Sequence, residues 1–322
     1  MAVNNPKQTR VVDPINTEVV RGYKNADFVG MGLFPAVPVS QYGGQVIEFG
    51  KEAFILYASN RARGAGTKRV RFGYEGKPFV VIPSSLEGVV PFEDMVDADQ
   101  VPGIDLSRGA VGLTMRSLTL GKEYQAAKLA TDPNNYGADN KVALAGGDKW
   151  SAAGSKPADQ INEAKRAIRK KIGVEPNTLV LSGDAFDALK ENASLLDKIK
   201  YTQRGSITTE IIAAAFDVDR VLVGKAVYAD NEAADFSDVW GNNAVLAYVP
   251  ANASMRYAPG SDGAMMNREE PSYGYSYVVG GMPMVEQPYQ DRNAKSWIYP
   301  VTYDATPVLS GVEAGYLFQN PL

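Results

Sequence analysis

Hydrophobic and polar positions divide the chain into an extended start, two strand-like runs, one long helix and a mixed second half. Residues 1–40 carry four prolines and scattered apolar side chains, without a sustained helical period. A stretch of this kind cannot bury its own apolar side chains, so they need another surface on the same chain or on a neighbour. We therefore expect residues 1–40 to form an extended N-terminal arm.

The next pattern is a pair of strand-like runs between Gly43 and Pro83. The runs GQVIEFGKEAFILYA and RVRFGYEGKPFVVIP are rich in β-branched and aromatic residues, and the polar loop SNRARGAGTK separates them. This arrangement predicts a long β-hairpin. Because an isolated two-stranded hairpin is only marginally stable in water, we expect this hairpin to lean on another surface.

The clearest helical period follows, and it predicts a helix from Leu106 to Ala130 that Asp105 caps. Such a helix is about 37 Å long. The predicted buried stripe consists of Leu106, Ala110, Leu113, Ser117, Leu120, Tyr124 and Ala127. Three glycines, each costing about 1 kcal/mol relative to alanine, lie inside the helix: Gly109, Gly112 and Gly121. We expect a sheet or partner to lie close along the helix where these glycines leave room.

Helical and strand patterns alternate in the second half, which predicts a compact α/β unit between about 151 and 255. One helix there places Ile161, Ala164, Ile168 and Ile172 on one face and ends at Gly173 after a basic turn, as the helix dipole and C-cap preferences favour. Beyond residue 256 the chain becomes β-rich and aromatic, with strands predicted in SYGYSYVVGG and KSWIYPVTY.

Composition removes several classes of function. The chain has no cysteine and no histidine, which excludes disulfides, thiolate metal sites and catalysis that depends on an imidazole. Lysine and arginine number 33 against 37 acidic residues, so the net charge is −4, which argues against a dedicated nucleic-acid-binding protein. No apolar run approaches the ~20 residues that a membrane span needs, and we expect a soluble protein made in the cytoplasm.

Candidate catalytic motifs fail on their details. The glycines of GAGTKR at 64 do not have the order of a phosphate-binding loop, and Ser182 lacks the flanking glycines and the histidine of a nucleophile elbow. The stretch DPNNYGADN lacks the ligands of a calcium loop, and Asp217 with Asp219 is interpreted as the edge of a loop rather than a glycosidase pair. We therefore predict no enzyme, and no catalytic, cofactor-binding or metal-binding residues; Ser182 or Asp184 is predicted to cap a helix.

Two charge clusters of opposite sign are the remaining candidate site. The basic set lies around the hairpin loop and comprises Arg61, Arg63, Lys68, Arg69 and Arg71. The acidic set lies downstream and comprises Glu87, Glu93, Asp94, Asp97 and Asp99. We hypothesise that the basic set of one copy docks on the acidic set of the next, where complementary charge would fix the register of the contact. The alternative is two solvated clusters that never meet.

At this point the order of elements resembles the Hong Kong 97-type fold of tailed-bacteriophage major capsid proteins. The segments PNTLVLSGDAFDALKENASLLDKIKYTQRG, TTEIIAAAFDVDRVLVGKAVY and VWGNNAVLAYVPA are similar to the axial domain of one branch of that family. The resemblance implies an α+β fold. Its parts would be an N-terminal arm (1–40), an extended β-hairpin loop (41–90), a peripheral domain with a spine helix (91–150), an α/β axial domain (151–255), and peripheral strands with a C-terminal tail that can return to the axial domain (256–322).

The resemblance also implies a function. The chain would be a structural head protein that self-assembles into hexamers and pentamers of an icosahedral shell around double-stranded DNA, without sequence-specific DNA binding or membrane contact. Its other partners would be portal, scaffolding and decoration proteins, and it would reside in the virion after assembly in the host bacterial cytoplasm. Two alternatives stay open: an encapsulin-type nanocompartment shell protein and, more remotely, a carboxylate-dependent hydrolase.

Overall fold

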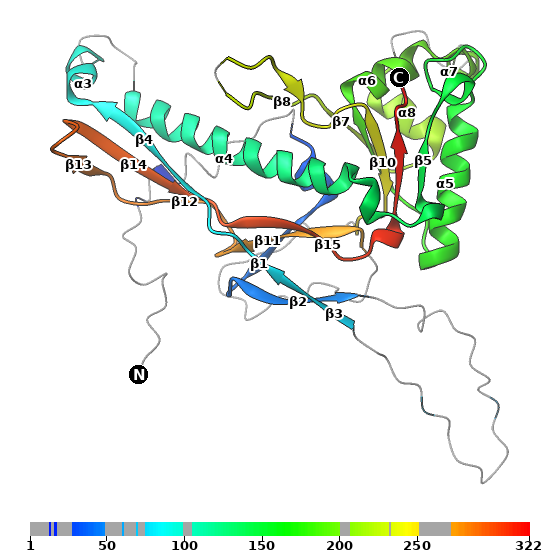
Figure 1. The fold of residues 1–322 in the computed structure, drawn as a ribbon, viewed down its shortest axis with the longest axis horizontal. Coiled ribbons are helices and arrows are strands. Elements are labelled where there is room, and N and C mark those ends of the chain that lie inside the picture. Colours follow the sequence, from blue (N-terminus) through cyan, green and yellow to red (C-terminus); the bar gives the residue numbers. More distant parts are fainter. Residues whose placement is uncertain are drawn as a thin grey trace.

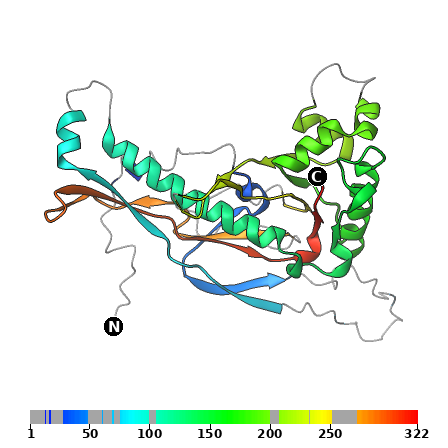
Figure 2. The same cartoon turned by 45° about the horizontal axis from the view of Figure 1, so that its top comes forward.

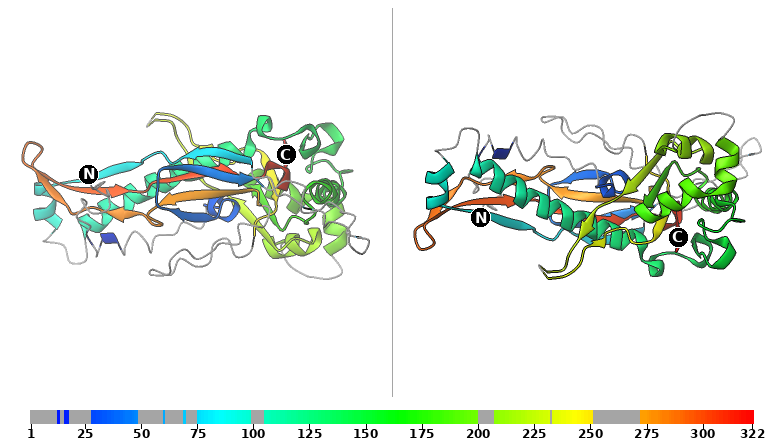
Figure 3. Two further views of the ribbon diagram at one scale, coloured as in Figure 1. Left: turned by 90° about the horizontal axis from the view of Figure 1, so that it is seen from below. Right: turned by 90° about the horizontal axis from the view of Figure 1, so that it is seen from above.

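The computed structural model describes residues 13, 16–17, 28–48, 60, 69, 75–98, 105–199, 207–231, 233–250 and 272–322. These residues form an elongated molecule in which a unit of helices and strands occupies one end, and one long helix runs from that unit along a set of strands (Figure 1). Seen from below and from above, the long helix lies on one side of these strands and the β2–β3 ribbon on the other (Figure 3).

The long helix, α4, spans Leu106–Thr131, which confirms the predicted helix. The side chain of Asp105 accepts a hydrogen bond from the backbone N–H of Arg108 at 3.0 Å, as a helix cap does. The predicted stripe is confirmed only in part. Ala127 is buried and Leu106, Ala110, Leu120 and Tyr124 are half-buried against the hydrophobic clusters, whereas Leu113 is 68% exposed and Ser117 is exposed. The buried residues of the helix are Val111, Thr114, Met115, Leu118, Glu123, Ala126, Ala127 and Ala130.

The expected role of the helix glycines is also wrong. A Cβ atom added at Gly109, Gly112 or Gly121 would meet nothing within 4 Å, so these positions face open space within the described part of the chain. The close approach is made instead by Gly88 of strand β4, where a Cβ atom would lie 3.0 Å from the carbonyl oxygen of Ala110. The strand, and not the helix, supplies the glycine that brings the two backbones together.

Two sheets support α4 along its length. In one, β14 is central and pairs antiparallel with β4, β12 and β13; the bounds are β4 Ser85–Pro91, β12 Met284–Val285, β13 Tyr289–Asp291 and β14 Ser296–Thr302. The other has the order β1-β11-β15, with bounds Ala36–Val39, Gly274–Val279 and Ala305–Leu309. The short helix α3, Phe92–Ala98, follows β4. Val111 and Met115 of α4 pack with Val90 and Val301 in one hydrophobic cluster.

The end unit is built on a five-stranded sheet with the order β5-β16-β10-β6-β7. Its strands are β5 Lys141–Ala143, β6 Thr178–Ser182, β7 Arg220–Gly224, β10 Asn243–Ala247 and β16 Gly315–Gln319. Its helices are α5 Pro157–Ile172, α6 Gly183–Glu191, α7 Ala193–Ile199 and α8 Thr209–Phe216. Four 3₁₀ turns complete the order: Pro133–Asn135, Ala138–Asn140, Gly146–Asp148 and Val312–Ala314.

Local predictions in the end unit are confirmed. Ile161, Ala164, Ile168 and Ile172 of α5 are buried, and Gly173 ends the helix with a φ of +73°. Ser182 caps α6, since its side chain accepts a hydrogen bond from the backbone N–H of Ala185. A second hydrophobic cluster contains buried residues of the five-stranded sheet, of α5 and of the C-terminal part of α4. Helix α4 therefore belongs to both hydrophobic clusters and joins them (Figure 2).

The described part of the predicted arm lies in the core of its own chain. Leu33, the last residue of helix α2 (Gly30–Leu33), and the following Phe34 are almost fully buried. Strand β1 pairs parallel with β11. The base of the predicted hairpin is an antiparallel pair, β2 Gly43–Glu48 with β3 Glu75–Val80. Most of residues 1–27 and of the loop between β2 and β3 lies outside the described residues.

Candidate assembly surfaces

The acidic set predicted from the sequence forms an exposed surface at the far end of α4 from the five-stranded sheet. Glu87 lies on β4, and Glu93, Asp94 and Asp97 lie on α3; all four are exposed. Glu87 accepts a hydrogen bond from the hydroxyl of Tyr289 at 3.1 Å. None of the ion pairs between described residues involves these four acids. Asp99 lies outside the described residues.

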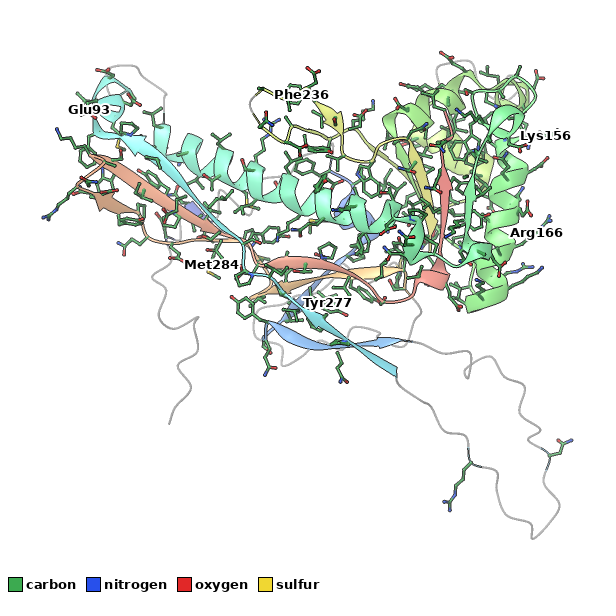
Figure 4. The ribbon with its side chains drawn as sticks, in the orientation of Figure 1. Glu93, Lys156, Arg166, Phe236, Tyr277 and Met284 are labelled. Carbon is green, nitrogen blue, oxygen red and sulfur yellow. The ribbon has the colours of Figure 1, made fainter. Side chains whose placement is uncertain are left out.

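The basic set is described only at Arg69, which is exposed; Arg61, Arg63, Lys68 and Arg71 lie outside the described residues. No ion pair between described residues joins Arg69 to the acidic set. Strand β3, which follows the basic segment in the sequence, lies below the strands under α4, whereas helix α3 with its labelled Glu93 lies at one end of α4 (Figures 1 and 4). Contact between the two sets within one chain therefore stays undemonstrated, and contact between copies stays a prediction.

The base of the β2–β3 ribbon is tied firmly to the body. The ring of Phe79 stacks on Tyr277 of β11 with centroids 4.1 Å apart. Asp304 accepts hydrogen bonds from the hydroxyl of Tyr42 at 2.7 Å and from the backbone N–H of Ser84 at 2.8 Å. The ammonium of Lys122 on α4 donates to the Ser84 hydroxyl at 2.7 Å. The ribbon therefore leaves the body at a fixed place.

A buried carboxylate joins three parts of the chain. Glu123 of α4 is only 4% exposed and accepts hydrogen bonds from the backbone N–H groups of Val29 and Gly30, at 2.9 and 2.8 Å. The indole N–H of Trp240 donates to the same carboxylate at 2.8 Å. Burial raises the pKa of Glu123, although the three donors act in the opposite direction. The carboxylate holds together the N-terminal segment, the long helix and the connection between strands β9 (Ser237–Asp238) and β10.

A second junction ties the end of α4 to the last strand. The hydroxyl of Tyr136 donates to the carbonyl of Ala130 at 2.7 Å, and the hydroxyls of Tyr136 and Tyr273 share a short hydrogen bond. Burial raises the pKa of both phenols, so both stay protonated and uncharged at neutral pH. Gly315 of β16 leaves room for the pair, because a Cβ atom there would lie 2.4 Å from the Tyr273 ring.

The remaining sequence candidates take structural roles. Asp217 ends α8 with a φ of +52°, and the buried ammonium of Lys165 donates to its carbonyl at 2.6 Å and to its carboxylate at 3.0 Å. The stretch DPNNYGADN forms 3₁₀ turns. Among the described residues, no cluster of three acidic side chains is arranged to hold a metal ion, and no helix is long and apolar enough to cross a membrane.

Sequence reasoning missed the Glu123 junction and the Lys122–Ser84–Asp304 contacts. Charged side chains are normally expected on the exposed face of a helix, so nothing in the local pattern marks Glu123 or Lys122 as inward-facing. The one usable signal was the rarity of tryptophan, of which the chain has three. A buried indole usually needs an acceptor for its N–H.

The chain is similar to known phage proteins in sequence and in structure. A family model described as phage major capsid protein E matches residues 119–297. The chain is 37% identical to the major capsid protein of Burkholderia phage BcepMu over 97% of each sequence. It is also similar to the crystal structure of a phage-related protein from Bordetella bronchiseptica, with 45% identity, a TM-score of 0.80, and 98% of this chain and 99% of that one covered.

The fold is shared with more distant capsids. The capsid structure of the cyanophage P-SCSP1u covers 89% of this chain and 86% of its own, with a TM-score of 0.55 at 11% identity. The predicted α+β, Hong Kong 97-like fold is confirmed. The family match favours the capsid protein over the encapsulin and hydrolase alternatives. The family model and the relative that is 37% identical agree, and the chain therefore belongs to the family of phage major capsid proteins.

Proposed function

We propose that copies of this capsid protein form hexameric and pentameric rings, which close into an icosahedral shell around double-stranded DNA. The observation that supports this best is a pair of apolar residues at the end of strand β3 and just after it, which stay exposed in the described part of the chain. Val80 is 66% exposed and Ile82 is 63% exposed. Exposed apolar surface favours contact with another molecule. A head-to-tail contact between identical subunits generates a closed ring when the rotation from one subunit to the next closes on itself.

The domain assignment is part of this proposal. We assign α4 as the spine of a peripheral domain, together with the strands of residues 256–310, and the unit around the five-stranded sheet as the axial domain. The last strand, β16, pairs with β10 and β5 in that sheet, which supports a C-terminal tail that returns to the axial domain. The segment 41–90 would provide the extended loop, of which the structure describes the base.

The charge contact is the second part of the proposal. The basic set around the loop between β2 and β3 would dock on the acidic set of α3 and β4 in the adjacent copy. Support comes from the exposure of Glu87, Glu93, Asp94 and Asp97 and from the absence of an ion-pair partner for them among the described residues. Complementary charges of this kind set the register of an interface more than its affinity.

The role proposed is structural and not catalytic. Portal, scaffolding and decoration proteins would be further partners, and the shell would assemble in the host bacterial cytoplasm and reside in the virion. The net charge of −4 suits a container whose DNA is held without sequence-specific binding, because a strongly cationic lining binds phosphate tightly at low salt.

Sedimentation of the purified chain, followed by negative-stain electron microscopy, tests the shell-forming role. We expect capsomers or megadalton particles. A chain that sediments only as a monomer or as a small oligomer at every concentration and salt level contradicts the proposal.

A charge exchange tests the docking contact. Reversing the five bases to Glu, or the five acids to Lys, is expected to reduce particle yield at low salt, and combining both reversals is expected to restore it. As a matched control, the same number of bases is reversed to Glu on the unit around the five-stranded sheet: Lys156, Arg166, Arg169, Lys170 and Lys190. If each reversal alone leaves assembly unchanged, the two sets do not meet.

A further inference from the structure

A small hairpin lies on the side of α4 that faces away from the β2–β3 ribbon (Figure 1). Among the described residues, it carries the most exposed aromatic side chain, Phe236. Strands β8, Val227–Tyr228, and β9, Ser237–Asp238, pair antiparallel, and 78% of Phe236 is exposed. Val227 on the same hairpin is 45% exposed. Phe236 points away from the body in Figure 4. Exposed aromatic residues of this kind serve as anchors in protein interfaces.

The base of this hairpin is held firmly, so Phe236 is presented from a fixed platform. The ring of Tyr228 lies against Tyr124 of α4, with centroids 4.8 Å apart. The Val239 N–H donates to the Ala226 carbonyl at 2.9 Å, and the next residue, Trp240, is bound to Glu123. Because the hairpin base is already fixed, less conformational entropy is lost when Phe236 enters an interface.

The opposite side of the molecule offers an apolar surface of matching kind. Side chains alternate along a strand, and Phe79 of β3 faces inward onto Tyr277, so Val80 faces away from the body. Val80 and Ile82 are the exposed apolar pair described above. Tyr277 and the ribbon lie below α4 in Figure 4, and Phe236 lies above it.

Charge favours the same pairing. Asp230, Asp235 and Asp238 are exposed around Phe236, which gives the hairpin an acidic rim. The ribbon that leads to Val80 carries the basic set, of which Arg69 is described and exposed. An apolar anchor with exposed acids on one side would therefore meet an apolar pair on the segment that follows Arg69 in the sequence on the other. Surfaces on opposite sides of one molecule suit a contact that repeats around a ring.

We infer that, within a ring, Phe236 of one copy seats on the Val80 and Ile82 surface of the adjacent copy. This inference rests on the proposed ring assembly and adds a specific apolar anchor to it.

Disulfide trapping tests this contact directly, because the chain has no native cysteine. Two double variants, Phe236→Cys with Val80→Cys and Phe236→Cys with Ile82→Cys, are assembled and oxidised. The matched control is Phe236→Cys with Leu196→Cys, which places the second thiol at an exposed position on α7. A disulfide forms only where the Cα atoms come within about 7 Å, so we expect a ladder of covalent multimers from at least one test pair and monomers from the control.

The outcomes separate the inference from the proposed function. Particles that assemble from both test pairs but yield only monomers after oxidation overturn the Phe236 contact and leave ring assembly intact. A wild-type chain that forms no ring overturns both.

Substitution of Phe236 gives a second readout that does not depend on disulfide formation. We expect Phe236→Ala to raise the concentration needed for assembly at least about tenfold, and Phe236→Leu to raise it less. Circular dichroism should match the wild-type chain, because the side chain is exposed. Equal assembly of Phe236→Ala and wild type at every concentration refutes the contact.

Discussion

Replacing Glu123 by alanine removes the carboxylate that joins the N-terminal segment, α4 and Trp240. The backbone N–H groups of Val29 and Gly30 and the indole N–H of Trp240 then lose their acceptor. An unsatisfied buried donor costs about 1–3 kcal/mol. We therefore expect Glu123→Ala to lower the free energy of unfolding substantially.

Two features of the structure reduce that loss. Glu123 and Gly30 line an apolar pocket of about 270 Å³. We expect water in this pocket to reach the freed donors, so the lower cost of about 1 kcal/mol for each of three donors applies. Burial raises the pKa of Glu123, so removing the carboxylate also removes part of a desolvation cost. The expected net loss is about 2–3 kcal/mol. Glu123→Gln keeps one acceptor and should lose about half as much.

Urea unfolding of dissociated subunits, followed by tryptophan fluorescence, measures this loss. Protein concentrations must be low enough that the midpoint no longer depends on them, since assembly would stabilise the folded state. The matched control is Gln125→Ala, an exposed position of similar size on the same helix. A loss for Glu123→Ala no larger than that for Gln125→Ala refutes the reasoning.

The pH dependence gives an independent check. Because the pKa of Glu123 is raised above its ordinary value of 4.5, the folded chain binds more protons than the unfolded chain between 4.5 and the raised pKa. This group's contribution to the free energy of unfolding therefore falls as pH rises through that window, by at most about 1.4 kcal/mol per pH unit. Glu123→Gln should lose that slope, and an unchanged slope contradicts the assignment.

Further substitutions test the packing. Gly88→Ala should destabilise the subunit by about 1–3 kcal/mol, because its Cβ would lie 3.0 Å from the Ala110 carbonyl oxygen. Gly112→Ala meets nothing within 4 Å and should stabilise it by about 0.5–1 kcal/mol; urea midpoints that reverse this order contradict the packing described. Lys165→Met should lower the thermal midpoint, because the carbonyls of Phe216 and Asp217 lose a buried donor at about 1–3 kcal/mol; an unchanged midpoint shows that water replaces it.

Much of the fold could be predicted because its signals are local. The bounds of α4 and α5 depend on caps and period, and Asp105 and Gly173 carry that information in the sequence itself. The buried side of α4 could not be predicted in the same way. Leu113 faces outward and Glu123 inward, because the strands that come from distant parts of the chain decide which side of the helix is covered.

Of the candidate surfaces, the charge sets could be predicted from the sequence and the exposed Phe236 could not. The two charge sets could be recognised because charges cluster in the sequence, and the exposure of the acidic set at Glu93 and its neighbours agrees with that pattern. Phe236 could not be recognised, since a phenylalanine between polar residues is usually buried. Its exposure depends on a hairpin base fixed by Tyr228 and Trp240, which are contacts of tertiary structure.

The place of β16 in the sheet has a consequence for synthesis. This strand is formed by residues 315–319, yet it lies between β5 and β10 in the middle of the order. The sheet therefore stays divided into β5 and the β10-β6-β7 part until residues 315–319 have been synthesised. A polypeptide that stops before residue 315 leaves β5 and β10 without the strand that joins them, so we expect it to fail to complete this sheet.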